Sequence, residues 1–389
     1  MKVRALTLLG LILLIAASAL IGLQPTLASP HNNPAAAPVR AVTPTASNTP
    51  VPSFTVNSTT DAPDASLGDG QCRTSANQCT LRAAIQQANA SPSTTDIVFV
   101  PAGTYSLTLA GTDDTAAAGD LDITASLVLF GAGAKNTIIE DNANDRVLQI
   151  IGGPTTVTLS GVTVRNGNVS GDGGGIHNAG ALTLNSSAVT GNDASVVSGS
   201  GGGIFNGGTL TINHSAIYSN AALGGAGIAN ANTGTLNLNS STVSSNNAPS
   251  GNGGGISTSG PLSLNSSTVA ANNSAYGGGG LLVVGGSVTM KNSILFGNTD
   301  PASPNCDGSV TSAGNNIVGS TIGGCSFTFQ SSDQFTDPLL GALGNNGGPT
   351  VTHALSASSL AIEAGNAAGC TDHVGAPILI EQRGQPRHL

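Results

Sequence analysis

A repeat with a nearly constant period dominates the chain between residues 173 and 298. Each unit has a glycine cluster followed by an apolar-x-apolar-Asn phrase, and successive phrases start at Leu182, Leu210, Leu236 and Leu262. The phrase ends at Asn185, Asn213, Asn239 and Asn265, and Val288-Thr289-Met290 opens a fifth unit. A second asparagine recurs at Asn192, Asn220, Asn246, Asn272 and Asn298. Such a fixed period is typical of a solenoid, in which each unit buries its apolar face only by stacking on the next.

The repeating unit is predicted to consist of strands. Its apolar segments are short, alternate with a period of two residues and are separated by Gly, Asn and Ser. Successive coils must then pair in parallel, and crossovers between parallel strands are almost always right-handed. We therefore expect an all-β fold, a right-handed parallel β-helix with about 26 residues per coil. The predicted inward residues are Leu184, Ile212, Leu238, Leu264 and Met290 on one wall and Val189, Ile217, Val243, Val269 and Leu295 on the next.

The in-register asparagines have a structural interpretation. Identical amides stacked at one position of successive coils form hydrogen-bonded ladders. Both asparagine sets are therefore predicted to be structural ladders.

Composition limits the core and the partners. Glycine accounts for 54 of 389 residues, Trp is absent and only 8% of the residues are charged, against about 25% in an ordinary domain. These values predict a narrow aliphatic core. The net charge is −9, which argues against nucleic acid as a partner because such binders need a basic surface.

The N-terminal part of the chain, up to residue 53, indicates export. Residues 1–28 have the layout of a signal peptide: Lys2 and Arg4, an apolar run, and a small-residue cleavage site at Ala28. Residues 29–53 are rich in Pro, Ala and Thr and are predicted to form a disordered linker. We expect a secreted or cell-surface protein without a membrane span in its mature form. An uncleaved N-terminal anchor is the alternative, because the apolar run is just long enough to span a bilayer.

A helix is predicted over residues 80–90, with Thr80 as its N-cap, and we expect it to cover the open end of the solenoid core. The segment Cys79-Thr80-Leu81-Arg82-Ala83-Ala84-Ile85-Gln86-Gln87-Ala88-Asn89 resembles the signature of the CSLREA domain of bacterial exported β-helix proteins. The tail resembles the choice-of-anchor Q region of the same proteins in Asp337 to Gly341, Asn346 to Thr350, Thr352 to Leu355, Ala361 to Asn366 and Gln382 to Gly384.

The resemblance departs from the family pattern at two places. Ala83 stands where the family has the Glu of a capping box, so one reciprocal hydrogen bond is lost. Family members continue past the Arg-Gly segment into a closing strand and a surface anchor, whereas this chain ends at Leu389. The expected organisation is a CSLREA-like cap at 54–110, the β-helix at 111–330 and a choice-of-anchor Q-like region at 331–389 that looks truncated.

Five cysteines fit an oxidising compartment. Cys72 and Cys79 flank one short loop and Cys306 and Cys325 another, so we pair them within each couple, although four cysteines formally allow three connectivities. The resemblance implies that the usual partner of Cys370 lies in the closing strand that this chain lacks. Cys370 is therefore expected to be a free thiol on a poorly ordered C-terminal segment.

No catalytic, cofactor or metal site is predicted. A glycoside hydrolase needs two carboxylates about 5 to 9.5 Å apart, and we expect Asp172 and Asp193 of the central coils to lie at different edges. His177 and His214 occupy different phases of the repeat and are interpreted as surface or ladder substitutions. Ca²⁺ remains an alternative for the denser acids earlier in the chain, Asp113, Asp114, Asp120, Asp122, Glu140, Asp141 and Asp145.

The leading functional hypothesis is an exported, non-catalytic, adhesin-like protein that binds an extracellular polysaccharide or a cell-surface protein; most of this assignment is implied by the resemblance. Tyr218 and Phe296 share one repeat phase, with Tyr276 nearby, and are the candidate ligand-contact aromatics. One alternative is a polysaccharide lyase or glycoside hydrolase on a pectate-lyase-like β-helix. Another is a passive structural spacer.

Overall fold

The computed structural model describes residues 53–142, 145–195, 198–319 and 324–387. These residues belong to one compact unit, Pro50–Leu389. The predicted signal peptide and the linker, up to residue 52, lie outside the described residues. No helix in the described part of the chain is long and apolar enough to cross a membrane.

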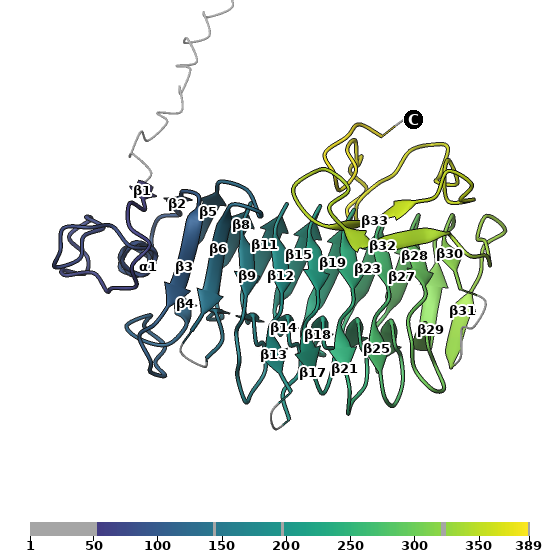
Figure 1. Ribbon diagram of the computed structural model, residues 1–389, viewed down its shortest axis with the longest axis horizontal. Helices are drawn as coiled ribbons and strands as arrows, with labels where there is room; N and C mark the ends of the chain where they lie inside the picture. The colour runs from purple at the N-terminus through teal and green to yellow at the C-terminus, as the bar shows by residue number, and fades with distance from the viewer. Residues whose placement is uncertain (1–52, 143–144, 196–197, 320–323, 388–389) are drawn as a thin grey trace, which may run out of the picture. The chain divides into compact units, whose positions relative to one another are not determined.

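Parallel strands from successive coils form three walls (Figure 1). Wall A contains β1 (Ser53–Thr55), β2 (Asp96–Val100), β5 (Leu127–Gly131), β8 (Thr156–Ser160), β11 (Ala181–Asn185), β15 (Thr209–Asn213), β19 (Thr235–Asn239), β23 (Leu262–Asn265) and β27 (Val288–Lys291). Wall B contains β3 (Gly103–Leu107), β6 (Thr137–Asp141), β9 (Thr163–Arg165), β12 (Ala188–Thr190), β16 (Ala216–Tyr218), β20 (Thr242–Ser244), β24 (Thr268–Ala270), β28 (Ile294–Phe296) and β30 (Ile317–Val318). Wall C contains β4 (Leu121–Ile123), β7 (Leu148–Ile150), β10 (Ile176–Asn178), β14 (Ile204–Asn206), β18 (Ile228–Asn230), β22 (Ile256–Thr258) and β26 (Leu281–Val283).

Two further sets of strands complete the coils. Strand β29 (Cys306–Ser312) pairs with both β26 of wall C and β27 of wall A, so it joins these two walls. Strand β31 (Cys325–Thr328) pairs with the other side of β29. A fourth row between walls B and C contains β13 (Asp193–Ala194), β17 (Ala221–Ala222), β21 (Asn247–Ala248) and β25 (Asn273–Ser274). The fold is an all-β parallel solenoid of the right-handed type, as the repeat predicted.

The register follows the repeat residue by residue. Leu182 pairs with Leu210, and Leu210 pairs with Leu236, so each phrase of the repeat stacks on the same phrase of the next coil. All ten predicted inward residues are at most 1% exposed. The core is therefore a continuous aliphatic column that runs through every coil of the repeat.

The solenoid begins earlier than the predicted boundary at residue 111. Strand β1 pairs with β2, and β2 pairs with β5 of the next coil. Strand β3 likewise opens wall B by pairing with β6. The boundary was wrong because the first coils lack the apolar-x-apolar-Asn phrase and are interrupted by the helix α1 (Leu81–Asn89).

Helix α1 forms where it was predicted. The side chain of Thr80 accepts a hydrogen bond from the backbone N–H of Ala83, as an N-cap does. Every residue from Leu81 to Ala88 is buried. Among them is Arg82, which the amphipathic pattern did not place inside.

One asparagine set forms a buried ladder inside the solenoid. Asn192, Asn220, Asn246, Asn272 and Asn298 are each at most 4% exposed, and each of the first four side-chain amides donates to the next amide oxygen at 2.8 to 3.0 Å. From Asn220 on, each oxygen also accepts the backbone N–H of the preceding ladder residue, as between Asn220 and Asn246 at 3.0 Å. The ladder satisfies the backbone at a corner where the strands of wall B end.

The glycine clusters make room for this ladder. A Cβ atom on Gly227 would lie 2.5 Å from the carbonyl oxygen of Gly255 and 2.8 Å from the side-chain nitrogen of Asn246. In the coils of the repeat, the corner between walls A and B does not use glycine, whereas the preceding coil has Gly161 there, with φ 67°. The left-handed residues at this corner of the repeat are Ser186, His214, Ser240, Ser266 and Asn292, with φ between 48° and 52°.

The C-terminal segment, residues 337–387, contains a short antiparallel hairpin of β32 (Leu340–Gly344) and β33 (Thr352–Leu355). Figure 1 draws this segment in yellow beside the coils of the repeat. The buried side chain of Gln382 attaches it to two coils: its amide donates to Ser215 O at 3.1 Å, and its oxygen accepts from the Thr242 hydroxyl at 2.7 Å. The expectation of a poorly ordered C-terminal segment is therefore wrong for residues 337–387.

Candidate functional site

The outer face of wall A carries two rows of in-register side chains. The first row contains Ile97, Val128, Thr158, Thr183 and Thr211, and the second contains Phe99, Phe130, Ser160, Asn185 and Asn213. None of these ten residues is charged. We call them the neutral track. Neighbouring strands in a sheet are ~4.8 Å apart, so the track repeats chemically similar groups at that interval.

Two phenylalanines open the track. Phe99 and Phe130 are 43% and 41% exposed, and their rings stack with centroids 5.8 Å apart and planes 20° apart. The sequence analysis missed this pair, because only the pairing of β2 with β5 places both rings on one outward position.

The outer asparagine ladder continues the second row. The amide of Asn213 donates to Asn185 at 3.0 Å, and Asn239 donates to Asn213 at 2.9 Å. Asn265 in turn donates to Asn239. A carboxamide has two N–H donors, and the ladder uses one of the two on each of Asn213, Asn239 and Asn265. Asn239 also contacts Nδ1 of His373, which belongs to the C-terminal segment.

A small pocket lies where the C-terminal segment meets wall A. Its volume is about 220 Å³, and its lining includes Asn237, Ser263 and Thr289, which continue the first row of the track, together with His373. The track therefore leads from an aromatic pair at one end to a pocket at the other.

A second candidate lies at the N-terminal end of wall C, where Asp120 and Asp122 flank the inward Leu121. These carboxylates are only 3% and 0% exposed. Burial, followed by the nearby charge of Asp122, raises the pKa of Asp120 to about 7. Burial also raises the pKa of Asp122 to about 6. Arg146 donates to Asp120 at 3.4 Å and to the side-chain oxygen of Gln149.

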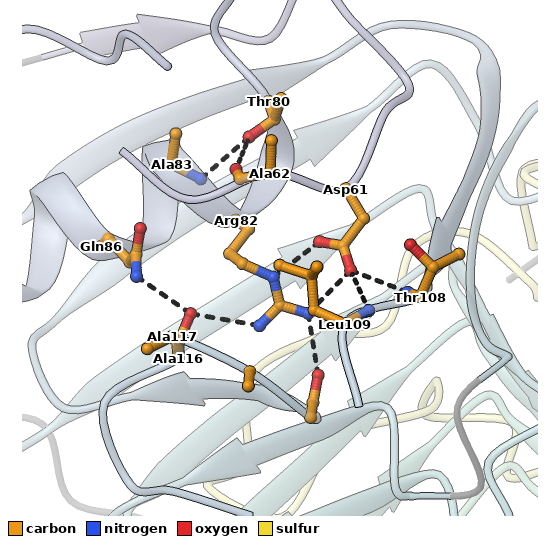
Figure 2. Close-up of polar contacts among 12 residues, drawn as sticks. Asp61, Ala62, Thr80, Arg82, Ala83, Gln86, Thr108, Leu109, Ala116 and Ala117 are labelled. Carbon is orange, nitrogen blue, oxygen red and sulfur yellow. Dashed lines mark hydrogen bonds and ion pairs between the residues drawn. The ribbon is translucent and has the colours of Figure 1, made fainter. Parts of the chain in front are cut away.

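The loop of residues 109–119 covers these carboxylates. The backbone N–H of Ala116 donates to Asp122 at 3.0 Å. Helix α1 holds the loop through Arg82, which donates to the carbonyl oxygen of Ala116 at 3.1 Å (Figure 2). Arg82 also donates to the carbonyl oxygen of Gly119 at 2.8 Å. The second carboxylate oxygen of Asp122 has no hydrogen-bond partner among the described residues.

Arg82 is itself paired inside the protein. Its guanidinium bonds both carboxylate oxygens of Asp61, at 2.6 and 3.1 Å, and both side chains are at most 2% exposed. Burial alone would raise the pKa of Asp61, but Arg82 and the backbone N–H groups of Thr108 and Leu109 bond its carboxylate, and the net pKa is lowered. Removing one partner of such a buried pair is strongly destabilising. Arg82 and Asp61 therefore hold the covering loop in place.

A cavity of about 490 Å³ lies between the C-terminal segment and the corner of walls A and B. His353 lines it and contacts Ser244 through Nε2 at 2.9 Å and the Gly341 carbonyl through Nδ1 at 2.7 Å. Because a carbonyl only accepts, Nδ1 carries the proton and Ser244 donates to Nε2. This resembles a nucleophile and its base, but Ser244 is 0% exposed. The contact attaches the hairpin to wall B.

Asp172 and Asp193, the two acids of the central coils that were predicted to lie apart, both accept hydrogen bonds from backbone N–H groups. Asp172 accepts from the N–H of Ser200 at 2.8 Å, and Asp193 accepts from the N–H of Ser195 at 2.7 Å. The part of the chain that the structure describes contains no group of three or more His, Cys, Asp or Glu side chains that could hold a metal ion.

The two predicted histidines are half-buried and lie in different parts of the coil. His177 on wall C stacks on Phe205, with ring centroids 5.1 Å apart. His214 lies at the corner of walls A and B, and its carbonyl accepts a hydrogen bond from Thr350 of the C-terminal segment. Burial lowers the pKa of both imidazoles.

The predicted aromatics do not form one platform. Tyr218 and Phe296 do occupy one outward position of wall B, but the register places them three strands apart. Tyr276, which is 74% exposed, follows β25 in the loop that leads to wall C. Tyr276 therefore does not share the outward position of wall B that the other two occupy.

Both expected disulfides are present, Cys72–Cys79 and Cys306–Cys325. Cys370 is a half-buried free thiol whose sulfur accepts a hydrogen bond from Arg387 at 3.7 Å.

Comparisons with known proteins add little. No family model matches the chain, and no curated protein matches it. Among solved structures, pectin methylesterase PemA from Erwinia chrysanthemi is similar at 13% sequence identity and a TM-score of 0.35, over 71% of this chain and 80% of that one. At that level the similarity carries no argument about activity.

Proposed function

We propose that the protein is exported and acts, without catalysis, as an adhesin-like β-helix that binds an extracellular polymer or cell surface. The observation that carries this proposal is the neutral track, an accessible, repetitive surface on one wall of a rigid solenoid. Solenoids commonly bind partners through such extended surfaces. The two disulfides support an oxidising destination outside the cytoplasm.

The buried acids favour a structural role over catalysis. A glycoside hydrolase must present its two carboxylates to the scissile bond. Here Asp120 and Asp122 are covered by a loop that Arg82 and Asp61 hold in place. Asp172 and Asp193 are engaged by backbone N–H groups.

The polysaccharide lyase or hydrolase alternative is favoured by one observation, the raised pKa values of Asp120 and Asp122 beside Arg146. Perturbed carboxyl pairs of this kind often occur in active sites. A polysaccharide degradation panel, with and without Ca²⁺, tests this alternative. We expect no product. Unsaturated or reducing-end product that disappears in Asp120→Asn or Asp122→Asn would overturn the non-catalytic proposal.

Binding is tested on an array of extracellular polysaccharides, matrix proteins and bacterial surfaces. The purified protein, with both disulfides intact, is expected to bind at least one of them. A matched variant, Thr183→Lys, places a charge on the neutral track and should weaken binding. If the protein binds no member of the array, the result favours the passive structural spacer.

A further inference from the structure

The chemistry of the neutral track restricts the kind of polymer it suits. Its central part offers hydroxyl and amide groups that both donate and accept hydrogen bonds. The track has no charge with which to pair an ionic ligand, and the chain carries a net charge of −9 that repels polyanions. A hydroxyl-rich, uncharged ligand satisfies both conditions.

The aromatic pair adds a second requirement. Phe99 and Phe130 stack on each other at consecutive positions of one row, so each ring covers one face of the other, and about two fifths of each side chain stays exposed, at 43% and 41%. Apolar C–H faces pack on such rings, whereas polar edges pair with hydroxyls and amides. A pyranose has both kinds of surface. A protein ligand fits less well, because protein interfaces are centred on aromatic, Met and Arg anchors, and the track has aromatic rings only at one end.

The spacing of the track adds a third requirement on the ligand. Adjacent coils are ~4.8 Å apart, which is close to the advance per residue of an extended, equatorially linked sugar chain. Four strand steps separate Phe99 on β2 from Asn213 on β15. The track is therefore about 19 Å long and matches about four sugar residues.

We infer that the neutral track binds a linear, uncharged polysaccharide that runs parallel to the stacking direction of the coils. The inference rests on the proposed function and names its ligand class. Apolar C–H groups of the sugars pack against the exposed parts of Phe99 and Phe130, and hydroxyls of the following sugar residues bond Thr183, Asn185 and their neighbours. The pocket beside His373 receives the sugar residue beyond Asn213.

Isothermal titration calorimetry tests the inference with three probes: neutral hexasaccharides of β-1,4-linked glucose, of β-1,4-linked mannose, and an anionic hexasaccharide of galacturonate. We expect a neutral hexasaccharide to bind, with an affinity that is independent of salt because no ion pair is involved. Affinity should rise with ligand length up to about five sugars, about four on the track and one in the pocket beside His373.

Two substitutions locate the site. The double variant Phe99→Ala and Phe130→Ala should lose about tenfold in affinity, because it removes the apolar contact area that the two rings offer to the sugars. Tyr276→Ala is the matched control, because it removes an exposed ring from a different part of the coil; its affinity should equal that of the wild type. A far-UV circular dichroism spectrum equal to that of the wild type verifies that the double variant folds; its unfolding midpoint should fall slightly, because the stacked ring pair is lost.

The outcomes separate this inference from the proposed function. Wild-type affinity in the double phenylalanine variant would overturn the track as the binding site. Binding only to the galacturonate probe, or only to proteins of the array, would overturn the ligand class while the proposed binding function stands. Failure to bind any polymer or surface would overturn both.

Discussion

The buried asparagine ladder makes a quantitative prediction for Asn246→Ala. Asn246 is 1% exposed, and its side-chain oxygen accepts both the backbone N–H and the amide N–H of Asn220, each at 3.0 Å. Alanine leaves these two buried donors without an acceptor. Each unsatisfied buried donor costs about 1–3 kcal/mol, so we expect a loss of about 4 kcal/mol. That is a large share of the ~5–15 kcal/mol that stabilises an ordinary domain.

Urea unfolding followed by circular dichroism measures this loss. Asn247→Ala is the matched control, because Asn247 is exposed and water can replace the hydrogen bond that it accepts from Asn273. The free energy of unfolding of this variant should lie within about 0.5 kcal/mol of the wild-type value. Solenoids can unfold without full cooperativity. Hydrogen exchange at the backbone N–H of Asn220 therefore provides a second, local measurement. Equal stability and equal protection in the two variants would refute the energetic role of the ladder.

Three further predictions concern the core, the acids and the thiol. Leu238→Asp should cost at least about 3 kcal/mol, because it buries an unpaired charge, whereas the outward Thr211→Asp should not; thermal unfolding of both variants checks this. A pKa of about 7 for Asp120 means that the folded state binds more protons than the unfolded state, so its contribution to stability is present below about pH 4 and is lost as pH rises to about 7. The lowered pKa values of His177 and His214 change the stability in the opposite direction, so the test compares the unfolding midpoint of the wild type with that of Asp120→Asn. Between about pH 5 and about pH 8, the midpoint of the wild type should fall more than that of the variant. Thiol labelling with mass spectrometry on unreduced protein should modify Cys370 alone, and a bridge from Cys370 to Cys306 would contradict the pairing.

The sequence predicts the repeat well because the repeat is local. Each inward leucine or valine stands at a fixed place in the repeating unit, so one unit predicts the next. A third ladder, in which Asn178 bonds Asn206 and Asn206 bonds Asn230, was missed. These residues do recur at the ends of the strands of wall C, but their unequal spacings, 28 and then 24 positions, obscured the period.

The candidate sites were harder to predict because they depend on long-range contacts. The aromatic pair exists only because β2 and β5 align Phe99 with Phe130 from different coils. The burial of Asp120 depends on a loop that Arg82 holds from 37 positions away in the chain. No local pattern records either contact, although Arg82 does lie in the segment that carries the family resemblance.

The attachment of the C-terminal segment has a consequence for the order of folding. A solenoid alone can grow coil by coil, since each coil contacts only its neighbours. Here Gln382 bonds Thr242 and Ser215, which stand 140 and 167 positions before it in the chain. Lys135 likewise bonds Asn345 and Gly348, which stand 210 and 213 positions after it. These contacts form only after the coils between them exist, and closing such long loops is entropically slow. The segment should therefore dock last and couple the coils it crosses, so that they unfold together rather than fray from one end.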